Sequence, residues 1–361
     1  MFKFVPRGYK SQFWSYGSPV LAILLTVVGT SIIFMIMGRP PGLAAYTFFV
    51  EPLLAHNGLS ALAVKAAPLI MIGVGLSIAY SANVWNIGAE GQFTLGAIFG
   101  GGIALALPEA PTFVVYPLML AFGILGGMVW AGITAWLRTQ FNANEILTSL
   151  MLTYVAQLLL LYLVTGPWRD PMGFGFPQTA MFSDEATTPV IIPGSHVHLG
   201  CLVALLIAGL FWLVLSKTML GFQLRVVGQA PRAARFAGFS ENRLIWIAML
   251  VSGGLAGLAG IFEVSGPIGQ LTTSISPGYG FSAVIVAFLG RLRPIGAIFG
   301  GLLLALSYLG GDSAQIDLGM PNAVTGIFQG ILLFCLLGCD ILILYKIQPR
   351  SLAAANAGVA K

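Results

Sequence analysis

The chain has 361 residues, of which 57% are hydrophobic and only 8% are charged, and its formal net charge is +5. A soluble domain carries about 25% charged residues, so this composition excludes a soluble globular protein. The apolar runs are long enough for membrane helices and lack the alternation of barrel strands. Because the basic residues lie between these runs, the positive charge indicates membrane topology and not nucleic-acid binding. We expect an all-α, polytopic membrane helix bundle that forms one domain over residues 1–361.

The apolar runs predict about ten transmembrane helices. The first is followed by Arg39, Pro40 and Pro41 and by no small-residue cleavage site, so we expect an uncleaved span and not a signal peptide. Two of the runs, 86–107 and 279–290, are interrupted by glycine or short. In chain order the predicted spans are 19–37, 61–82, 86–107, 113–137, 146–165, 199–215, 244–262, 279–290, 295–310 and 323–344.

Ten crossings place both termini on one side of the membrane. With the N-terminus in the cytoplasm, all but three of the 17 Lys and Arg residues fall on the cytoplasmic side; Arg39, Lys65 and Arg169 are the exceptions. This distribution agrees with the positive-inside rule. We therefore expect cytoplasmic N- and C-termini.

Residues 81–92, SANVWNIGAEGQ, are polar between two apolar runs. A charge at the bilayer centre costs about 3 kcal/mol even on lenient scales, so this stretch should face a cavity or lie at the interface. Short, glycine-interrupted helices at membrane depth are typical of transporters. A tight polar turn between two spans is the alternative. The candidate residues for a translocation path here are Asn83, Asn86, Glu90 and Gln92.

Two further regions lie on the outer side in this topology. Residues 263–279 contain Gln270, a fifth candidate for the path, and their polar groups could line an outer vestibule or face water. The long segment 166–198 contains five prolines and could contact a partner or form a loosely packed cap. Its two histidines, His196 and His198, are interpreted as surface residues.

Small residues repeat at a spacing of four along several runs, as in the two copies of GAIFGG that begin at Gly96 and Gly296. Such spacing lets helix backbones approach closely in lipid. We expect a compact bundle, with further contacts of this kind at the glycine pairs 123/127, 253/257 and 326/330. The three cysteines lie in apolar runs and are interpreted as packing residues.

The stretch 217–243 contains five of the Lys and Arg residues. Pro231 can open a short helix and Gly238 can end it. From composition alone, an ordinary basic loop that sets topology is the more common case, and a short amphipathic helix that docks a soluble partner is the alternative.

No catalytic constellation, metal-ligand cluster or cofactor motif is present, so we expect no enzyme activity in this chain. Glu90 is the one acidic residue predicted inside the membrane, whereas an ion-driven carrier usually has more buried ionisable groups. The energy for transport should therefore come from a partner.

Four motifs occur in an order that resembles one family. They are NIGAEGQ at 86–92, Asn144-Glu145-Ile146 followed by Met151-Leu152, GQAPRAARFAG at 228–238, and GYGFSAVIVAFLGRLRPIG at 278–296. The family is that of permease subunits of bacterial ATP-binding-cassette (ABC) importers of the branched-chain amino acid and simple-sugar type. The similarity covers about residues 60–340 and is closest to the nucleoside and simple-sugar branch.

The resemblance implies a set of partners: a second permease subunit, two cytoplasmic ATPase subunits and an extracytoplasmic solute-binding protein. It also implies that the cytoplasmic loop 217–243 contains the helix that couples the permease to the ATPase. The coupling residues would then be Gly228, Gln229, Arg232, Arg235, Phe236 and Gly238.

The resulting prediction is a multi-pass permease of the bacterial inner membrane, surrounded by lipid, that imports a nucleoside or simple sugar by alternating access. A permease for branched-chain or other amino acids and an ion-coupled secondary transporter are the alternatives. A lipid-modifying enzyme would need a reactive residue at the interface, and none stands out. An assembly subunit with no conduit would shield residues 81–92 in every state.

Overall fold

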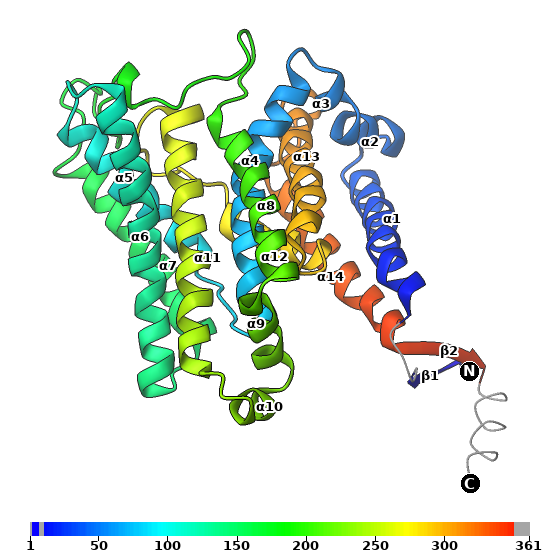
Figure 1. The fold of residues 1–361 in the computed structure, drawn as a ribbon. Coiled ribbons are helices and arrows are strands. Elements are labelled where there is room, and N and C mark those ends of the chain that lie inside the picture. Colours follow the sequence, from blue (N-terminus) through cyan, green and yellow to red (C-terminus); the bar gives the residue numbers. More distant parts are fainter. Residues whose placement is uncertain (1, 7–10, 350–361) are drawn as a thin grey trace. The chain divides into compact units, whose positions relative to one another are not determined.

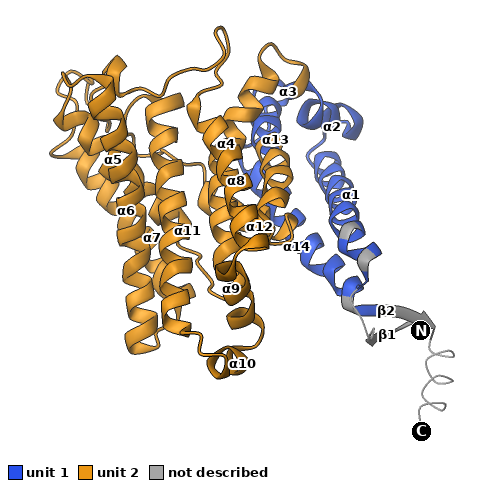
Figure 2. Ribbon diagram, in the orientation of Figure 1, with its two compact units in different colours: residues 1–52, 307–361 blue, residues 53–306 orange. Residues whose placement is uncertain are grey.

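The computed structural model describes residues 2–6 and 11–349. The chain divides into two compact units, of which unit 2 is Leu53–Leu306 and unit 1 combines the terminal segments 1–52 and 307–361 (Figure 2). Four basic residues assigned to the cytoplasmic side, Arg7, Lys10, Arg350 and Lys361, lie outside the described residues, as do both chain ends.

Unit 2 is a helical bundle (Figure 1). A 3-10 turn at Asp184–Ala186 lies in the connection between the helices 145–165 and 199–217. A π-helix at Val264–Ile268 directly follows the helix 241–263. Two helices cross the boundary between the units, α3 (Glu51–Leu54) and α13 (Pro294–Leu318). The helices of unit 2 are α4 (Gly58–Ser81), α5 (Ala89–Ala106), α6 (Thr112–Phe141), α7 (Glu145–Thr165), α8 (Leu199–Lys217), α9 (Met219–Gln229), α10 (Pro231–Phe236), α11 (Glu241–Glu263) and α12 (Tyr279–Leu289).

Unit 1 is built on α1 (Gln12–Ile36), which packs against α14 (Ala323–Leu344), and on α2 (Pro41–Phe49). Four phenylalanine rings from these helices pack together: Phe34, Phe48, Phe49 and Phe328. The strands β1 (Phe2–Pro6) and β2 (Tyr345–Pro349) form an antiparallel ladder. The all-α prediction missed this ladder, whose aromatic and β-branched residues favour extended backbone.

Each of the ten predicted spans contains a helix, and eight of the described helices are long and apolar enough to cross a membrane. The helices α5 and α12 are not among the eight. α12 has 11 residues, about 16 Å at 1.5 Å per residue, which is half of a hydrocarbon core about 30 Å thick. α5 begins with the polar residues Glu90 and Gln92, which lower its hydropathy.

The core of unit 2 forms where α11 packs against α5 and α6. A Cβ placed on Gly96 of α5 would lie 2.2 Å from the Cα of Gly257, and one on Gly127 of α6 would lie 2.1 Å from the carbonyl oxygen of Gly253. These contacts confirm the predicted close approach of helices at small residues. In α14 the prediction is wrong as far as the described residues go, because a Cβ on Gly326 or Gly330 would have no neighbour among them within 4 Å.

Candidate functional site

The polar stretch 81–92 is a break between α4 and α5. Residues 82–88 are not helical, and Asn83 adopts a left-handed conformation with φ 56°. Asn86 and Gln92 exchange two side-chain hydrogen bonds of 2.8 and 2.9 Å. The Asn86 amide also donates to the Ser252 hydroxyl on α11 at 3.0 Å. Asn86 and Gln92 are almost completely buried, so this network holds the break in place and satisfies its polar groups.

Glu90 lies where two helices begin. It is in the first turn of α5, and its Oε2 accepts a 2.6 Å hydrogen bond from the Gly280 N–H in the first turn of α12. A Cβ on Gly280 would lie 2.2 Å from the Glu90 nitrogen, so only glycine allows this approach. The starts of α5 and α12 therefore meet inside unit 2 at one carboxyl group.

A pocket of about 470 Å³ opens beside this junction. Its wall combines the start of α5, one face of α7 and the non-helical residues that precede α12. Most of the lining side chains are polar. The lining residues are Glu90, Thr94, Tyr154, Gln157, Leu158, Leu160, Leu161, Thr273, Ser274, Ile275 and Ser276.

Of the five residues predicted for a translocation path, Glu90 alone lines this pocket. Asn86 and Gln92 lie in the buried network, and the Asn83 amide oxygen accepts a bond from the Trp85 indole. Gln270 lies in the non-helical stretch that precedes α12, and its side-chain amide donates to the side chain of Gln178 at 3.4 Å. Four of the five residues therefore lie in or directly after the break, and of these only Glu90 lines the pocket; Gln270 lies apart from both.

Sequence reasoning missed the α7 wall of the pocket. Gln157 is a strongly polar residue in the middle of a Leu-rich helix, and Tyr154 lies one turn before it. Both side chains are exposed in this chain. An amide in the middle of an apolar span is the feature that could have identified this wall, because polar groups inside membranes are costly without a partner.

Glu263 and His198 differ from their predicted environments. Glu263, expected to face water or a vestibule, is buried, and its carboxylate accepts a 3.3 Å bond from the Tyr279 hydroxyl. It is therefore a second acidic residue inside unit 2, which the sequence analysis did not predict. His198, expected on the surface, is 4% exposed. Its Nδ1 accepts the Gly200 N–H and caps α8, and its ring packs against Phe262.

The segment 166–198 is joined to the residues that lead to the pocket. Thr188 donates its N–H to the Ser265 carbonyl at 2.7 Å, and its hydroxyl pairs with the Ser265 hydroxyl at 2.7 Å. Further along, the Thr179 N–H donates to the Leu271 carbonyl at 2.9 Å. The loop therefore holds residues 265–272, and the pocket wall begins at the next residue.

The predicted coupling stretch forms α9 and α10. Gly228 packs against the end of α4, where a Cβ would lie 2.2 Å from the Ser81 carbonyl oxygen, so its role in the structure is packing. Gln229, Arg232 and Arg235 are exposed. Phe236 is 95% exposed at the end of α10.

Two features determine the shape of this helical turn. Gly238 has φ +78°, a conformation that favours glycine, and it directs the chain from α10 towards α11. Arg235 forms a 2.7 Å salt bridge with Glu241. The result is an exposed surface in which an aromatic ring is flanked by arginines.

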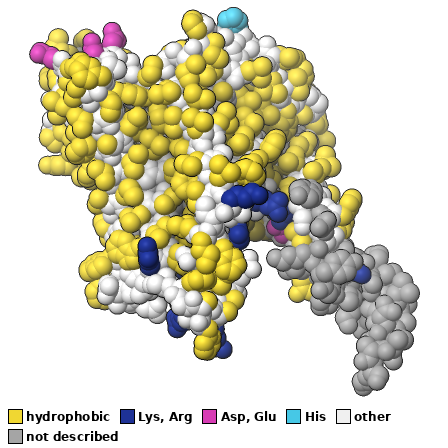
Figure 3. Space-filling model, viewed as in Figure 1, with side chains coloured by type: hydrophobic (Ala, Val, Ile, Leu, Met, Phe, Trp, Pro, Cys, Tyr) yellow, Lys and Arg dark blue, Asp and Glu magenta, His cyan; other side chains and the backbone are white. Residues whose placement is uncertain are grey.

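Charge separates along unit 2. In the face shown in Figure 3, Lys and Arg side chains lie toward the end that contains α10, and a group of acidic side chains lies at the opposite end. A broad hydrophobic band lies between them. This order matches a membrane protein with a basic cytoplasmic end.

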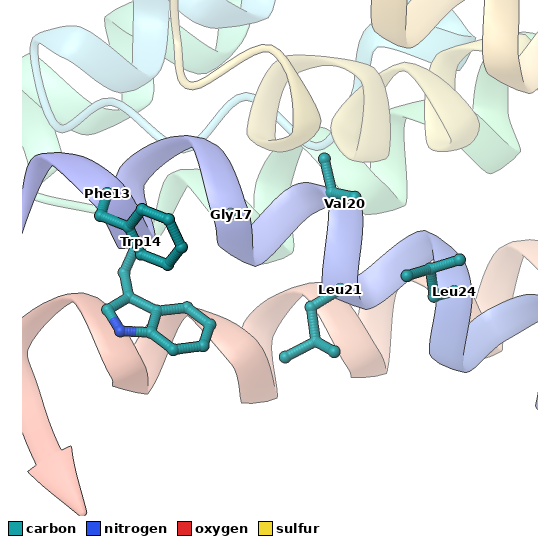
Figure 4. Close-up of a pocket in the computed structure, with 6 residues that line it drawn as sticks. All are labelled: Phe13, Trp14, Gly17, Val20, Leu21 and Leu24. Carbon is teal, nitrogen blue, oxygen red and sulfur yellow. The ribbon is translucent and has the colours of Figure 1, made fainter.

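A second cavity of about 510 Å³ lies along α1 in unit 1. Figure 4 shows its lining of Phe13, Trp14, Gly17, Val20, Leu21 and Leu24. These residues supply no ionisable group, and α1 is a candidate membrane span. The groove therefore suits acyl chains of the surrounding lipid and lacks the groups that a polar solute needs.

Comparisons with known proteins agree with this architecture. Residues 58–337 match the family model described as branched-chain amino acid transport system / permease component. The chain is 37% identical to the glucose ABC transporter permease protein TsgB13 of Haloferax volcanii, over 95% of this chain and 92% of that protein.

Two proteins of Bacillus subtilis are also similar. The guanosine ABC transporter permease protein NupP is 28% identical over 87% of this chain and 91% of its own length. The guanosine ABC transporter permease protein NupQ is 29% identical over 68% of this chain and 80% of its own length.

Proposed function

Because the chain belongs to the family of branched-chain amino acid transport system permease components, we propose that its pocket at the start of α5 and α12 is part of the path for an imported nucleoside or simple sugar. The chain itself is a multi-pass membrane protein and the non-catalytic permease component of an ABC transporter. ATP hydrolysis belongs to separate subunits. The relatives named for guanosine and glucose support a hydroxyl-rich solute.

The observation behind this proposal is a pocket that contains several polar side chains and lies beside two helices that begin within the bundle. Helices that start at membrane depth expose unpaired N–H groups to solutes, and non-helical backbone at that depth requires a cavity or protein around it. Thr273, Ser274 and Gln157 supply neutral donors and acceptors, which suit hydroxyl groups of a sugar or ribose.

We propose that the membrane is crossed ten times. In this topology α5 completes its crossing with the non-helical residues 82–88, and α12 completes its crossing with residues 269–278. An even number of crossings before residue 217 then places α9 and α10 in the cytoplasm together with both termini. This membrane would be the cytoplasmic membrane. Because similar proteins come from an archaeon and from a bacterium, the proposal covers the cytoplasmic membrane of either kind of cell and not only the bacterial inner membrane.

The pocket also supports the proposed second permease subunit. Tyr154 and Gln157 are exposed in this chain although they lie in the middle of a candidate membrane span. An amide in contact with hydrocarbon is unfavourable, so we propose that a partner permease covers this face and completes the path. Bacillus subtilis has two similar guanosine permeases, NupP and NupQ, which favours a pair of related chains.

The exposed surface of α10 is our proposed contact with the ATPase. An exposed aromatic ring flanked by arginines is the composition that protein interfaces favour. Gln229, Arg232 and Phe236 would contact the ATPase, while Gly228 and Gly238 would fix the position and end of the helix. The solute-binding protein would dock on the opposite, external end.

Uptake into proteoliposomes tests the pocket. The vesicles should contain this chain, its partner permease, the ATPases and the binding protein, with ATP inside and labelled guanosine, glucose or leucine outside. We expect uptake of guanosine or glucose, and a loss of about tenfold in rate for Gln157→Leu, since one hydrogen bond to a solute is worth about 1 kcal/mol or more. Gln140→Leu, at the exposed end of α6, is the matched control.

Three outcomes would contradict the proposal. Uptake of leucine alone would assign the chain to amino acids. Uptake driven by an ion gradient without ATPase subunits would indicate a secondary transporter. Equal rates for Gln157→Leu and Gln140→Leu would remove the pocket from the path.

A further inference from the structure

We propose that the solute-binding protein docks on an apolar loop of the segment 166–198, residues 172–176, with Phe174 as its anchor. We call these five residues the docking tip. This inference rests on the proposed function, which assigns such a partner to the external end of the chain. It deepens that function by naming the contact surface and by connecting it to the pocket.

Backbone hydrogen bonds close the docking tip at its base. The Asp170 N–H donates to the Gln178 carbonyl at 2.8 Å, and the Asp170 carboxylate accepts the Met172 N–H at 2.9 Å. Phe174 has φ +51°, a left-handed conformation that is rare for a bulky side chain. Because these bonds hold the turn in one shape, a partner meets a preformed surface and loses less entropy on binding.

The large side chains of the docking tip are apolar and exposed. Phe174 is 98% exposed, and Met172 and Phe176 are also exposed. Gly173 and Gly175 separate these three residues, so no other side chain stands between them. Apolar groups of this size gain free energy when they leave water, and aromatic residues and Met are enriched in protein interfaces. The docking tip therefore has the composition of a contact surface.

The base of the docking tip is bonded to the residues that continue into the pocket wall. Gln178 pairs with Thr272 in a β-bridge, and the Thr179 hydroxyl accepts the Leu271 N–H at 3.0 Å. The next residues, 273–276, line the pocket. A partner that pulls or presses on the docking tip therefore acts on the pocket wall. This connection favours the protein that delivers the solute as the partner.

The helix α5 supplies a second connection. A Cβ on Gly102, near the end of this helix, would lie 2.9 Å from the indole ring of Trp168, and one on Gly101 would lie 3.0 Å from the side chain of Leu271. The first turn of the same helix places Glu90 at the pocket. Residues on both sides of the docking tip thus pack against a helix that begins at the pocket.

Charge indicates the chemistry of the partner. The segment 166–198 lies at the end of unit 2 opposite α10 (Figure 1), and its 3-10 turn contains the exposed residues Asp184 and Glu185. Arg169 is the one Lys or Arg residue of this segment. A binding protein that presents an apolar recess with a basic rim would complement this end. We therefore expect docking to weaken as salt is added.

Photo-crosslinking identifies what covers the docking tip. Phe174→p-benzoylphenylalanine is introduced into the assembled transporter in lipid nanodiscs, and the binding protein is added before illumination. We expect a crosslink to the binding protein. Phe113, an exposed phenylalanine in the first turn of the α6 span, is the matched control position and should crosslink to lipid.

The affinity of docking measures the contribution of the ring. Phe174→Ala should raise the Kd of the binding protein for the transporter in nanodiscs by about 30-fold, the loss that interface hot spots show. Phe174→Tyr keeps the ring and should keep most of the affinity, and Phe113→Ala should leave the Kd unchanged. The crosslink gives a result even if Phe174→Ala fails to assemble.

The outcomes separate the contact from the path. A crosslink from position 174 to lipid or to the partner permease, no crosslink at all, or an unchanged Kd for Phe174→Ala would overturn the docking tip. These results would leave the path in place, because uptake by the Gln157→Leu variant tests it independently. A crosslink to the binding protein together with equal uptake by Gln157→Leu and Gln140→Leu would keep the contact and remove the pocket from the path.

Discussion

At the scale of single residues, buried polar side chains in this protein bond to partners from other parts of the sequence. Glu90 bonds to Gly280, Asn86 to Ser252, and Glu263 to Tyr279. Each of these pairs satisfies a buried polar group, which costs about 1–3 kcal/mol if its partner is lost. The pairs therefore determine which polar residues remain available to a solute.

His198 gives a prediction at this scale. Its burial lowers the pKa of the imidazole from 6.5 to about 4, and it lies before the first residue of the α8 span. The pKa of this imidazole is lower in the folded state than in the unfolded state. The contribution of neutral His198 to the free energy of unfolding is therefore complete above about pH 6.5 and is lost as the pH falls toward 4. At pH 5 the expected loss is about 2 kcal/mol.

Thermal unfolding of the purified protein in detergent at pH 5 and pH 7.5 measures this loss. His198→Asn keeps a side-chain acceptor for the N-terminus of α8 and removes the titration, so its melting temperature should change less between the two pH values. If the melting temperature of the variant changed with pH as much as that of the parent chain, the titration of groups other than His198 would be responsible.

At the scale of elements, the chain uses two helices that are too short or too polar to cross the membrane unaided, α5 and α12. Each continues from a segment with no regular helix, and their first turns meet at Glu90 and Gly280. α10 is shorter still, and its exposed surface lies beyond the hydrophobic band. These three elements account for the proposed path and the proposed coupling, while the longer helices hold them in position.

The α10 surface gives a prediction that separates contact from structure. Arg235 bonds to Glu241, so Arg235→Glu alone removes both the salt bridge and the proposed ATPase contact. The double change Arg235→Glu with Glu241→Arg restores the bridge and reverses the charge on α10. We expect Phe236→Ala and the double variant to lower transport-coupled ATPase activity by about 30-fold, because interface anchors of this kind are worth about 2 kcal/mol.

Membrane insertion and melting temperature should stay unchanged in the same variants, since Phe236 is exposed in this chain and the double variant keeps the salt bridge. Gln140→Leu again serves as the control. Recovery of full coupling by the double variant would show that Arg235 acts only through its salt bridge.

At the scale of the whole molecule, the separation of charge predicts which end of unit 2 faces the cytoplasm. In a chain without native cysteines, Arg232→Cys should react with an impermeant maleimide only after the membrane is opened. Ser195→Cys, on the opposite end, should react in intact cells. Labelling of Arg232→Cys from outside would reverse the orientation and contradict the proposed contact with a cytoplasmic ATPase.

The amino-acid sequence alone determined the class of protein, the positions of the helices and the family resemblance that the comparisons then confirmed. Hydropathy and glycine spacing are local properties, and each predicted span contains a helix. The polar break at 81–92 was also evident, because charges and amides stand out in an apolar chain.

The tertiary structure decided which polar residues line the pocket and which are bonded to one another. Asn86 and Gln92 satisfy each other, Glu263 is inside unit 2, and His198 is buried under Phe262. Gln157 joined the site because α7 packs beside α5. Pairing between residues far apart in sequence depends on how helices pack, and composition and periodicity hold no information about that contact.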